Sequence, residues 1–172
     1  FLRNINFNHS QDVYASIVAS PRFGWYNPMA EIDYSQSFLH TDGFDINKPS
    51  NRPCFNFRLN NRFNITRSLK AFLNMRYKTS QLNDLQYTKP FARVDVKLTK
   101  SFLNDALEIG VYANDLFKTD KERWTMYGSH TIMTKDCYGY ERCVGMTVSY
   151  NFNTAKSKYK GTGAGNAEKR RL

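Results

Sequence analysis

The chain has 172 residues, of which 41% are hydrophobic and 15% aromatic, and its formal net charge is +10. Its uninterrupted apolar runs are only a few residues long, whereas a membrane-spanning helix needs roughly 18 to 20 apolar residues. The composition therefore offers no spanning helix, but it leaves room for a β-barrel, whose strands cross a bilayer with about 9 to 11 residues. The cations are spread along the chain and its tail rather than gathered in one patch, so we expect no nucleic-acid partner.

The N-terminal part of the chain alternates between apolar and polar residues, which is typical of β-strands because successive side chains point to opposite faces. Ile5 and Phe7 close a first short strand, and residues 13–19 and 30–38 predict a second and a third. Ser20, Pro21 and Arg22 predict a tight turn between the latter two. Residues 40–51 form a long polar loop.

The alternation continues through the middle and the end of the chain. Strands are predicted at residues 54–65, 69–78, 92–98, 107–113 and 144–152, with loops at 80–86 and 101–105. Residues 119–140 are long and mixed, and we expect 124–133 to extend a strand. We expect 1–152 to be one β-domain and 153–172 a basic, glycine-rich tail with little order.

The predicted connections alternate strictly between short and long. The short connections are residues 21–23, 66–68 and 101–105, and the long ones are residues 40–51, 80–86 and 119–140. An up-and-down antiparallel sheet then carries all its short turns at one end, which is typical of outer-membrane barrels and not of Greek-key sandwiches. The sequence therefore predicts an all-β fold, an antiparallel up-and-down meander of about eight strands that forms the C-terminal part of a transmembrane β-barrel.

The length of the strands and the position of their aromatic residues favour the same fold. The predicted strands run about 9 to 15 residues, whereas strands of soluble proteins average about 5 to 6. Aromatic residues stand near many strand ends, as in the aromatic girdles of membrane barrels. We therefore expect lipid on the apolar face and a watery lumen on the polar face. The basic residues predicted to face the lumen are Arg58, Arg62, Arg76, Lys78, Arg93 and Lys97.

Three stretches carry a resemblance to a known family. They are KLTKSFLNDALEIGVYANDLFKT at 97–119, CVGMTVSYNFN at 143–153 and the tail SKYKGTGAGNAEKRRL. Together they resemble the C-terminal β-barrel region of TonB-dependent outer-membrane receptors of the Bacteroidetes type, and SPRFGWYNPMAEIDYSQSFL is similar but less specific. The final strand also resembles the signal read by the outer-membrane assembly machinery, which the positions Gly145, Val148, Tyr150 and Phe152 match.

The resemblance implies one segment of a receptor with about 22 strands and an internal plug. The strand-like start FLRNINFN likewise favours a fragment. The implied partners are outer-membrane lipid, the remaining barrel strands and plug, TonB acting through a missing N-terminal part, and the barrel-assembly machinery. The implied location is the bacterial outer membrane, and the implied function is energy-coupled nutrient uptake.

No pattern in the sequence points to catalysis, a cofactor or a metal site. His9, His40 and His130 are isolated in sequence, and the three cysteines have no metal-ligand spacing. Cys137 and Cys143 could pair across a hairpin end in an oxidising compartment. Asp95 and Glu108 suggest salt bridges in the lumen more than an acid–base pair. We expect no enzyme, and two alternatives stay open: a complete eight-stranded outer-membrane barrel with a structural or adhesive role, and a soluble carbohydrate-binding β-sheet domain.

Overall fold

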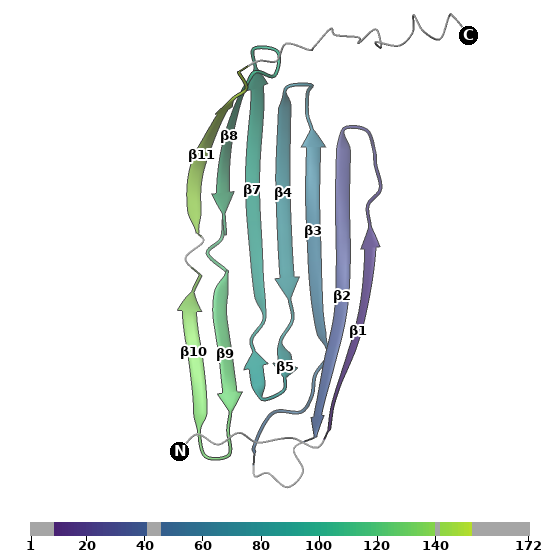
Figure 1. The fold of residues 1–172 in the computed structure, drawn as a ribbon, viewed down its shortest axis with the longest axis vertical. Helices are drawn as coiled ribbons and strands as arrows, with labels where there is room; N and C mark the ends of the chain where they lie inside the picture. Colours follow the sequence, from purple (N-terminus) through teal and green to yellow (C-terminus); the bar gives the residue numbers. More distant parts are fainter. Residues whose placement is uncertain (1–8, 41–45, 140–141, 153–172) are drawn as a thin grey trace, which may run out of the picture.

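The computed structural model describes residues 9–40, 46–139 and 142–152. These residues form two antiparallel sheets and no helix, and none of their segments is a helix long and apolar enough to cross a membrane (Figure 1). The strands are β1 (His9–Ala19), β2 (Tyr26–His40), β3 (Cys54–Asn64), β4 (Leu69–Lys78), β5 (Gln81–Asn83), β6 (Gln86–Thr88), β7 (Phe91–Phe102), β8 (Leu107–Asn114), β9 (Lys121–Tyr127), β10 (Ile132–Tyr138) and β11 (Cys143–Tyr150).

The two sheets continue one another along their strands, and together they are called the wall below. The larger sheet has seven strands in the order β1-β2-β3-β4-β7-β8-β11, and the smaller has four in the order β10-β9-β6-β5. The smaller sheet repeats the order of the last four strands of the larger one, because β5 continues β4, β6 leads into β7, β9 continues β8 and β10 leads into β11 (Figure 1). The predicted antiparallel meander is thus confirmed, and four of its long strands are interrupted once.

The predicted asymmetry of the connections is also confirmed. Residues 20–25, 65–68 and 103–106 make short connections at the upper end of the wall in Figure 1, and the long connections all lie at the other end. In an outer-membrane barrel the short turns face the periplasm and the long loops face the outside. The upper end in Figure 1 is therefore the one that we interpret as periplasmic.

Two predicted segments differ from the structure. Residues 124–133 are not one strand, because β9 ends at Tyr127 and Gly128 donates to the carbonyl of Thr131 at 2.8 Å in a turn before β10. Residues 80–86 are not a plain loop, because β5 and most of the turn of a short hairpin occupy them. The two hairpins are joined into one sheet by the pairing of β6 with β9, which gives both strands a second hydrogen-bonded neighbour.

Other predictions fall partly outside the described residues. The first predicted strand, at Ile5 and Phe7, and the tail at 153–172 both lie there, as does part of the loop 40–51. The final strand ends at Tyr150, so Phe152 follows it rather than belonging to it.

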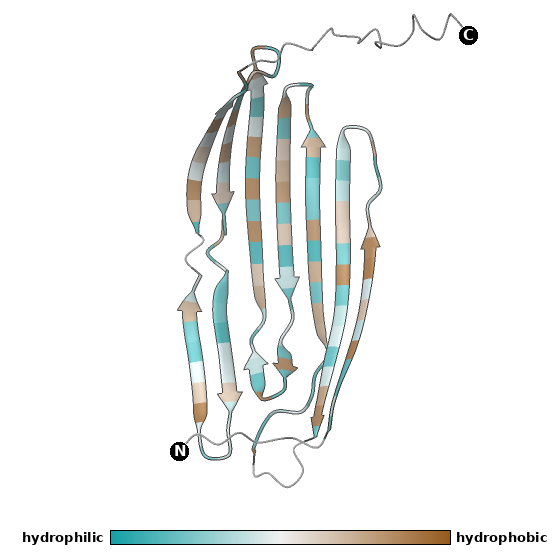
Figure 2. Cartoon of the chain, in the orientation of Figure 1, coloured by the Kyte–Doolittle hydropathy of each residue, from teal (hydrophilic) through white to brown (hydrophobic). Residues whose placement is uncertain are grey.

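The wall has almost no buried apolar core. Among the described residues, the buried hydrophobic side chains are Leu39, Cys54, Leu82 and Ala106. Large apolar side chains instead cover one face without any layer over them, and Val144, Met146 and Val148 are 86%, 66% and 60% exposed. Figure 2 shows the resulting bands of hydrophobic and hydrophilic residues along the long strands. A soluble sheet would bury such a face against a second layer, so this arrangement requires lipid.

Aromatic residues gather at two levels of the apolar face. Near the short turns, the rings of Trp25, Tyr26 and Phe63 contact one another at centroid distances of 4.9 to 6.1 Å. Near the long loops, a second row lines up across neighbouring strands, comprising Tyr34, Phe55, Phe57 and Tyr77. The eight steps from Phe55 to Phe63 span about 27 Å along β3, which is a height of about 21 Å at a strand tilt of about 40°. That height is close to the apolar band of an outer-membrane barrel, about 25 Å.

One polar residue interrupts the apolar face of β3, and its neighbours satisfy it. Asn61 is only 4% exposed. Its Oδ1 accepts a hydrogen bond from the hydroxyl of Tyr26 at 2.7 Å, and its Nδ2 donates to the carbonyl of Leu73 at 3.0 Å. Because a polar group facing lipid is costly unless it is hydrogen-bonded, these two bonds explain how the break in alternation is tolerated.

Candidate functional site

The six basic residues predicted to face the lumen lie on a single face of the larger sheet. The register places Arg58 opposite Arg76 and Arg76 opposite Arg93, so that three arginines stand in one row across β3, β4 and β7. Two places along, Asn56 stands opposite Lys78. In the other direction, Arg62 stands opposite Phe72, and Phe72 opposite Lys97.

Two carboxylates of β2 pair with the first arginine of this row. Nη2 of Arg58 donates to Oε1 of Glu31 at 2.6 Å and to Oδ2 of Asp33 at 2.7 Å. Asp33 is 7% exposed, and Asn56 Nδ2 and Ser16 Oγ, each at 2.8 Å, also donate to it. The carboxylate of Asp33 is therefore a hub that ties β1, β2 and β3 together on the polar face.

A second cluster surrounds the last arginine of the row. Arg93 Nε lies 2.9 Å from Oδ1 of Asp95, and its Nη1 lies 3.0 Å from Oδ2 of Asp120. Asp95 Oδ1 also accepts a hydrogen bond from the backbone amide of Asp115 at 2.8 Å. Asp95 and Glu108 do not meet, because Glu108 stands opposite Ser101, six residues along β7 from Asp95.

Aromatic residues on the polar face lie beneath two of the arginines. The guanidinium of Arg62 is 6.0 Å from the ring centroid of Phe72, and that of Arg76 is 5.3 Å from the ring of Phe91. These cation–π contacts shield apolar rings that would otherwise face the polar side of the wall. They account for the exception that Phe72 makes to the alternation of β4.

Sequence reasoning identified the basic residues but missed most of their acidic partners. Glu31 and Asp33 were visible as polar residues in an alternating strand, and the register that sets them beside Arg58 was not. Asp115 and Asp120 lie in the interruption between β8 and β9, which no periodicity indicates.

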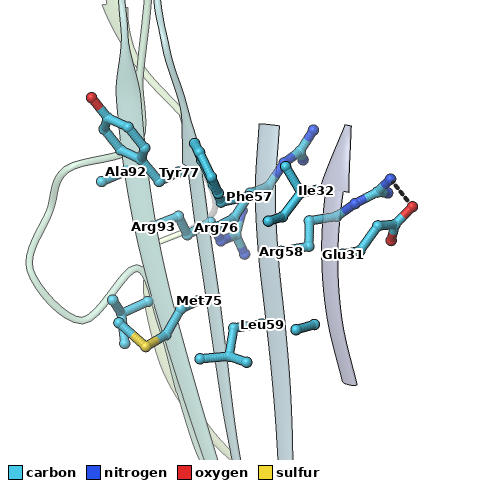
Figure 3. Close-up of a pocket in the computed structure, with 12 residues that line it drawn as sticks. Glu31, Ile32, Phe57, Arg58, Leu59, Met75, Arg76, Tyr77, Ala92 and Arg93 are labelled. Atoms are coloured by element: carbon cyan, nitrogen blue, oxygen red, sulfur yellow. Dashed lines mark hydrogen bonds and ion pairs between the residues drawn. The ribbon is translucent and has the colours of Figure 1, made fainter. Parts of the chain in front are cut away.

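A shallow hollow occupies the apolar face on the other side of the same strands. It has a volume of about 380 Å³ and lies between large side chains that include Ile32, Phe57, Met75 and Tyr77, where Ala30 and Ala92 leave space. Figure 3 shows this hollow beside the arginine row, with the ion pair between Glu31 and Arg58 drawn as a dashed line. Acyl chains of lipid fill such gaps on a membrane-facing surface.

The comparison with known protein families identifies the class of protein to which this sheet belongs. The model of a family described as "Outer membrane protein beta-barrel family" matches residues 1–150. This chain belongs to that family. No curated protein and no solved structure matches it.

Membership of the outer membrane protein beta-barrel family places the chain in the bacterial outer membrane. It also excludes the soluble carbohydrate-binding domain, in agreement with the uncovered apolar face. In a membrane barrel the apolar face meets lipid and the polar face lines the interior. We therefore interpret the arginine row and its acids as the inner surface of the barrel.

The hairpin of β9 and β10 lies outside the apolar band. Both of its faces carry charged residues: Arg123 stands opposite Asp136 on one, and Lys135 opposite Trp124 on the other. Lys135 donates to Glu122 at 2.7 Å, and this hydrogen bond lowers the pKa of Glu122. A strand pair with charges on both faces fits water and not lipid, so in this outer-membrane barrel protein it extends the wall beyond the membrane on the side of the long loops.

The histidines and cysteines are arranged differently from the sequence-based prediction. His9 and His40 are not isolated. His9 begins β1, His40 ends β2, and the two are register partners whose ring centroids are 5.8 Å apart. Cys137 is the last residue but one of β10 and Cys143 begins β11, so the two follow each other along the sheet and do not face each other across a hairpin; both are free thiols. Within the described ranges, no group of three or more potential ligands is placed to hold a metal ion.

The residues of the predicted assembly signal divide between the two faces. Val148 and Tyr150 stand on the apolar face, opposite Ile109 and Leu107 of β8. Gly145 stands on the polar face opposite Tyr112, whose ring lies directly over it, so that a Cβ added at Gly145 would collide with the tyrosine ring and its hydroxyl oxygen. Packing against Tyr112 therefore explains by itself why residue 145 is a glycine. Recognition of these residues by the assembly machinery stays a prediction.

A double-mutant cycle separates the two reasons for Gly145. Gly145→Ala is expected to destabilise the native protein by about 1 to 3 kcal/mol, because the added methyl group collides with Tyr112. In a Tyr112→Ala background the same substitution should cost less than about 1 kcal/mol, which unfolding in denaturant can measure. If the yield of assembled protein falls equally in both backgrounds, the glycine is needed by the assembly machinery and not by the packing.

Proposed function

We propose that the chain forms part of the wall of a TonB-dependent receptor, which binds a scarce nutrient and imports it across the outer membrane. The observation that carries this proposal is an open sheet: seven long strands are paired in sequence, and neither β1 nor β11 pairs with a further strand among the described residues. An open edge offers unpaired amides and carbonyls to lipid, which cannot satisfy them.

A larger barrel supplies partners for both edges. Seven tilted strands cover only a part of the circumference of a receptor with about 22 strands, and further strands would close the wall. The stretches at 97–119 and 143–153 support this reading through their resemblance to such receptors. The charged inner face supports it too, because a wide lumen that holds a plug or water tolerates arginines and carboxylates.

The proposal assigns a role to each part of the chain. The apolar face contacts outer-membrane lipid, the edges pair with the remaining strands, and the inner face surrounds a plug domain. TonB acts on the plug and not on these residues, and the final strand is read by the barrel-assembly machinery. The chain itself binds and guides rather than catalyses, and it needs no cofactor.

Genetic dependence on TonB tests this function. A strain that lacks the protein should take up at least one scarce nutrient more slowly, and we would screen iron chelates, cobalamin, glycans and peptides by growth and uptake. In a strain that also lacks TonB, the deletion should have no further effect on that nutrient. An uptake defect that is equally large with and without TonB would contradict the proposal.

The size of the native barrel tests it independently. The protein should be recovered in the outer membrane and should migrate differently in a detergent gel before and after heating. A native barrel with the mass of about eight strands would favour the alternative, a complete small barrel with a structural or adhesive role.

A further inference from the structure

The row of three arginines has an unusual electrostatic arrangement. Arg58, Arg76 and Arg93 stand directly opposite one another on adjacent strands, where like charges repel. The outer two are neutralised by carboxylates, namely Glu31 and Asp33 for Arg58 and Asp95 and Asp120 for Arg93. Arg76 contacts no carboxylate of the described residues, and its guanidinium lies over the ring of Phe91. Arg76 is therefore the arginine of this row that has no carboxylate partner among the described residues.

The surroundings of Arg76 include hydrogen-bond donors that bond to no other described residue. A hollow of about 250 Å³ opens on the polar face and is lined by Arg58, Asn60, Asn74, Arg76, Arg93 and Asp95 together with Met75. Nε of Arg58 is buried and has no hydrogen-bond partner. Asn60 and Asn74 stand opposite each other, and neither side-chain amide bonds to another described residue. The guanidinium of Arg76 and the amides of Asn60 and Asn74 can donate to an acceptor that enters the hollow, whereas the buried Nε of Arg58 cannot be reached from it.

The chemistry of the donors defines that acceptor. A guanidinium offers a planar fork that matches the two oxygens of a carboxylate or phosphate. The neighbouring amides can donate to the same oxygens. Asp95, the carboxylate among the described residues that line the hollow, is already bound to Arg93 and to the amide of Asp115. We propose that this hollow is an oxyanion site centred on Arg76.

The oxyanion can come from two sources. One is a soluble carboxylate or phosphate in the lumen, and the other is a carboxylate of whichever segment of the native protein lies inside the barrel. The oxyanion site shares one assumption with the proposed function, namely that the polar face lines the lumen of the barrel. It does not depend on which nutrient is imported or on TonB.

The test uses the native protein, purified from the outer membrane in detergent, and its thermal unfolding midpoint. The variant is Arg76→Gln, and the matched control is Arg62→Gln, which removes another cation stacked on a ring of the same face but outside the hollow. Each protein is heated in increasing sodium phosphate and sodium citrate, with sodium chloride at equal ionic strength as the reference.

Either source gives its own result. If the anion comes from solution, phosphate or citrate raises the midpoint of the wild type and of Arg62→Gln, and Arg76→Gln weakens the apparent affinity by about tenfold or more. If it is a carboxylate of the protein, no added anion has an effect, and Arg76→Gln lowers the midpoint well below that of Arg62→Gln.

The proposal is overturned if the two variants have the same midpoint and the same response to anions. It is overturned as well if Arg76→Gln raises the midpoint, since the row would then be relieved of repulsion and not deprived of a partner. Neither the unfolding midpoint nor its response to anions depends on transport. A negative result here would therefore not contradict TonB-dependent uptake, and a negative uptake result would not contradict the oxyanion site.

Discussion

Replacing Met75 by arginine should destabilise the barrel in a lipid bilayer by about 2 to 4 kcal/mol, the cost of an arginine on the lipid face near the membrane midplane. Met75 belongs to β4, stands between Leu59 and Val94 on the apolar face, halfway between the two aromatic levels, and is 43% exposed. In water an arginine at so exposed a position would cost little, because its head would remain hydrated. The large expected effect therefore depends on lipid and not on protein contacts.

Lys97→Arg is the matched control, because Lys97 is on the neighbouring strand β7 and its side chain points to the opposite face. It keeps a cation where the polar face already carries one, so we expect a change of less than about 0.5 kcal/mol. The measurement is unfolding of the native protein by guanidinium in phospholipid vesicles, with the heat-dependent gel shift as a second readout. Equal stabilities of the two variants would show that the lipid and lumen faces have been assigned the wrong way round or do not exist.

The faces of the wall could be predicted from the sequence because alternation is a local property. Phe57 and Arg58 point to opposite sides whatever the rest of the chain does, since each strand has a period of two. The same reasoning placed the six named basic residues on the polar side of their strands. The strict alternation of loop lengths then fixed the up-and-down topology, and with it the end that carries the long loops.

The pairing of charges could not be predicted in the same way, because it depends on register. Asn61 and the turn at residues 65–68 set which residue of β4 stands opposite Arg58, and a slip of two residues would keep every face while separating the arginines. His9 and His40 are a clear case: they are 31 residues apart in sequence, and only the pairing of β1 with β2 brings them together.

The interruptions of the long strands were missed for a different reason. β9 and β10 stand in water on both sides, so neither face is selected to be apolar and the alternation that revealed the other strands is lost. The prediction of one strand at 124–133 therefore ran through the turn at Gly128. Hydrogen bonds of Asp95, Asp115 and Asp120 instead hold the connection at which β8 ends and β9 begins.

Asp115 is the residue whose loss should most disturb this level of the wall. It is 2% exposed and has a φ of 47°, and its Oδ1 accepts hydrogen bonds from the backbone amides of Thr119 at 2.8 Å and Asp120 at 3.2 Å. Through Asp120 it also positions the carboxylate that contacts Arg93. The connection from β8 to β9 is thus held by one side chain.

Asp115→Ala should therefore destabilise the native protein by about 3 kcal/mol or more. The substitution leaves two amides without their acceptor, at about 1 to 3 kcal/mol each, and puts alanine in a left-handed conformation that costs about 1 to 2 kcal/mol. Asp115→Asn is the matched control, because asparagine keeps the acceptor oxygen and tolerates a positive φ, so it should cost less than about 1.5 kcal/mol. Guanidinium unfolding gives both free energies, and hydrogen exchange at Thr119 and Asp120 should accelerate in the alanine variant alone. If alanine and asparagine cost the same, the charge of Asp115 and not its hydrogen bonds to the loop holds the two sections of the wall together.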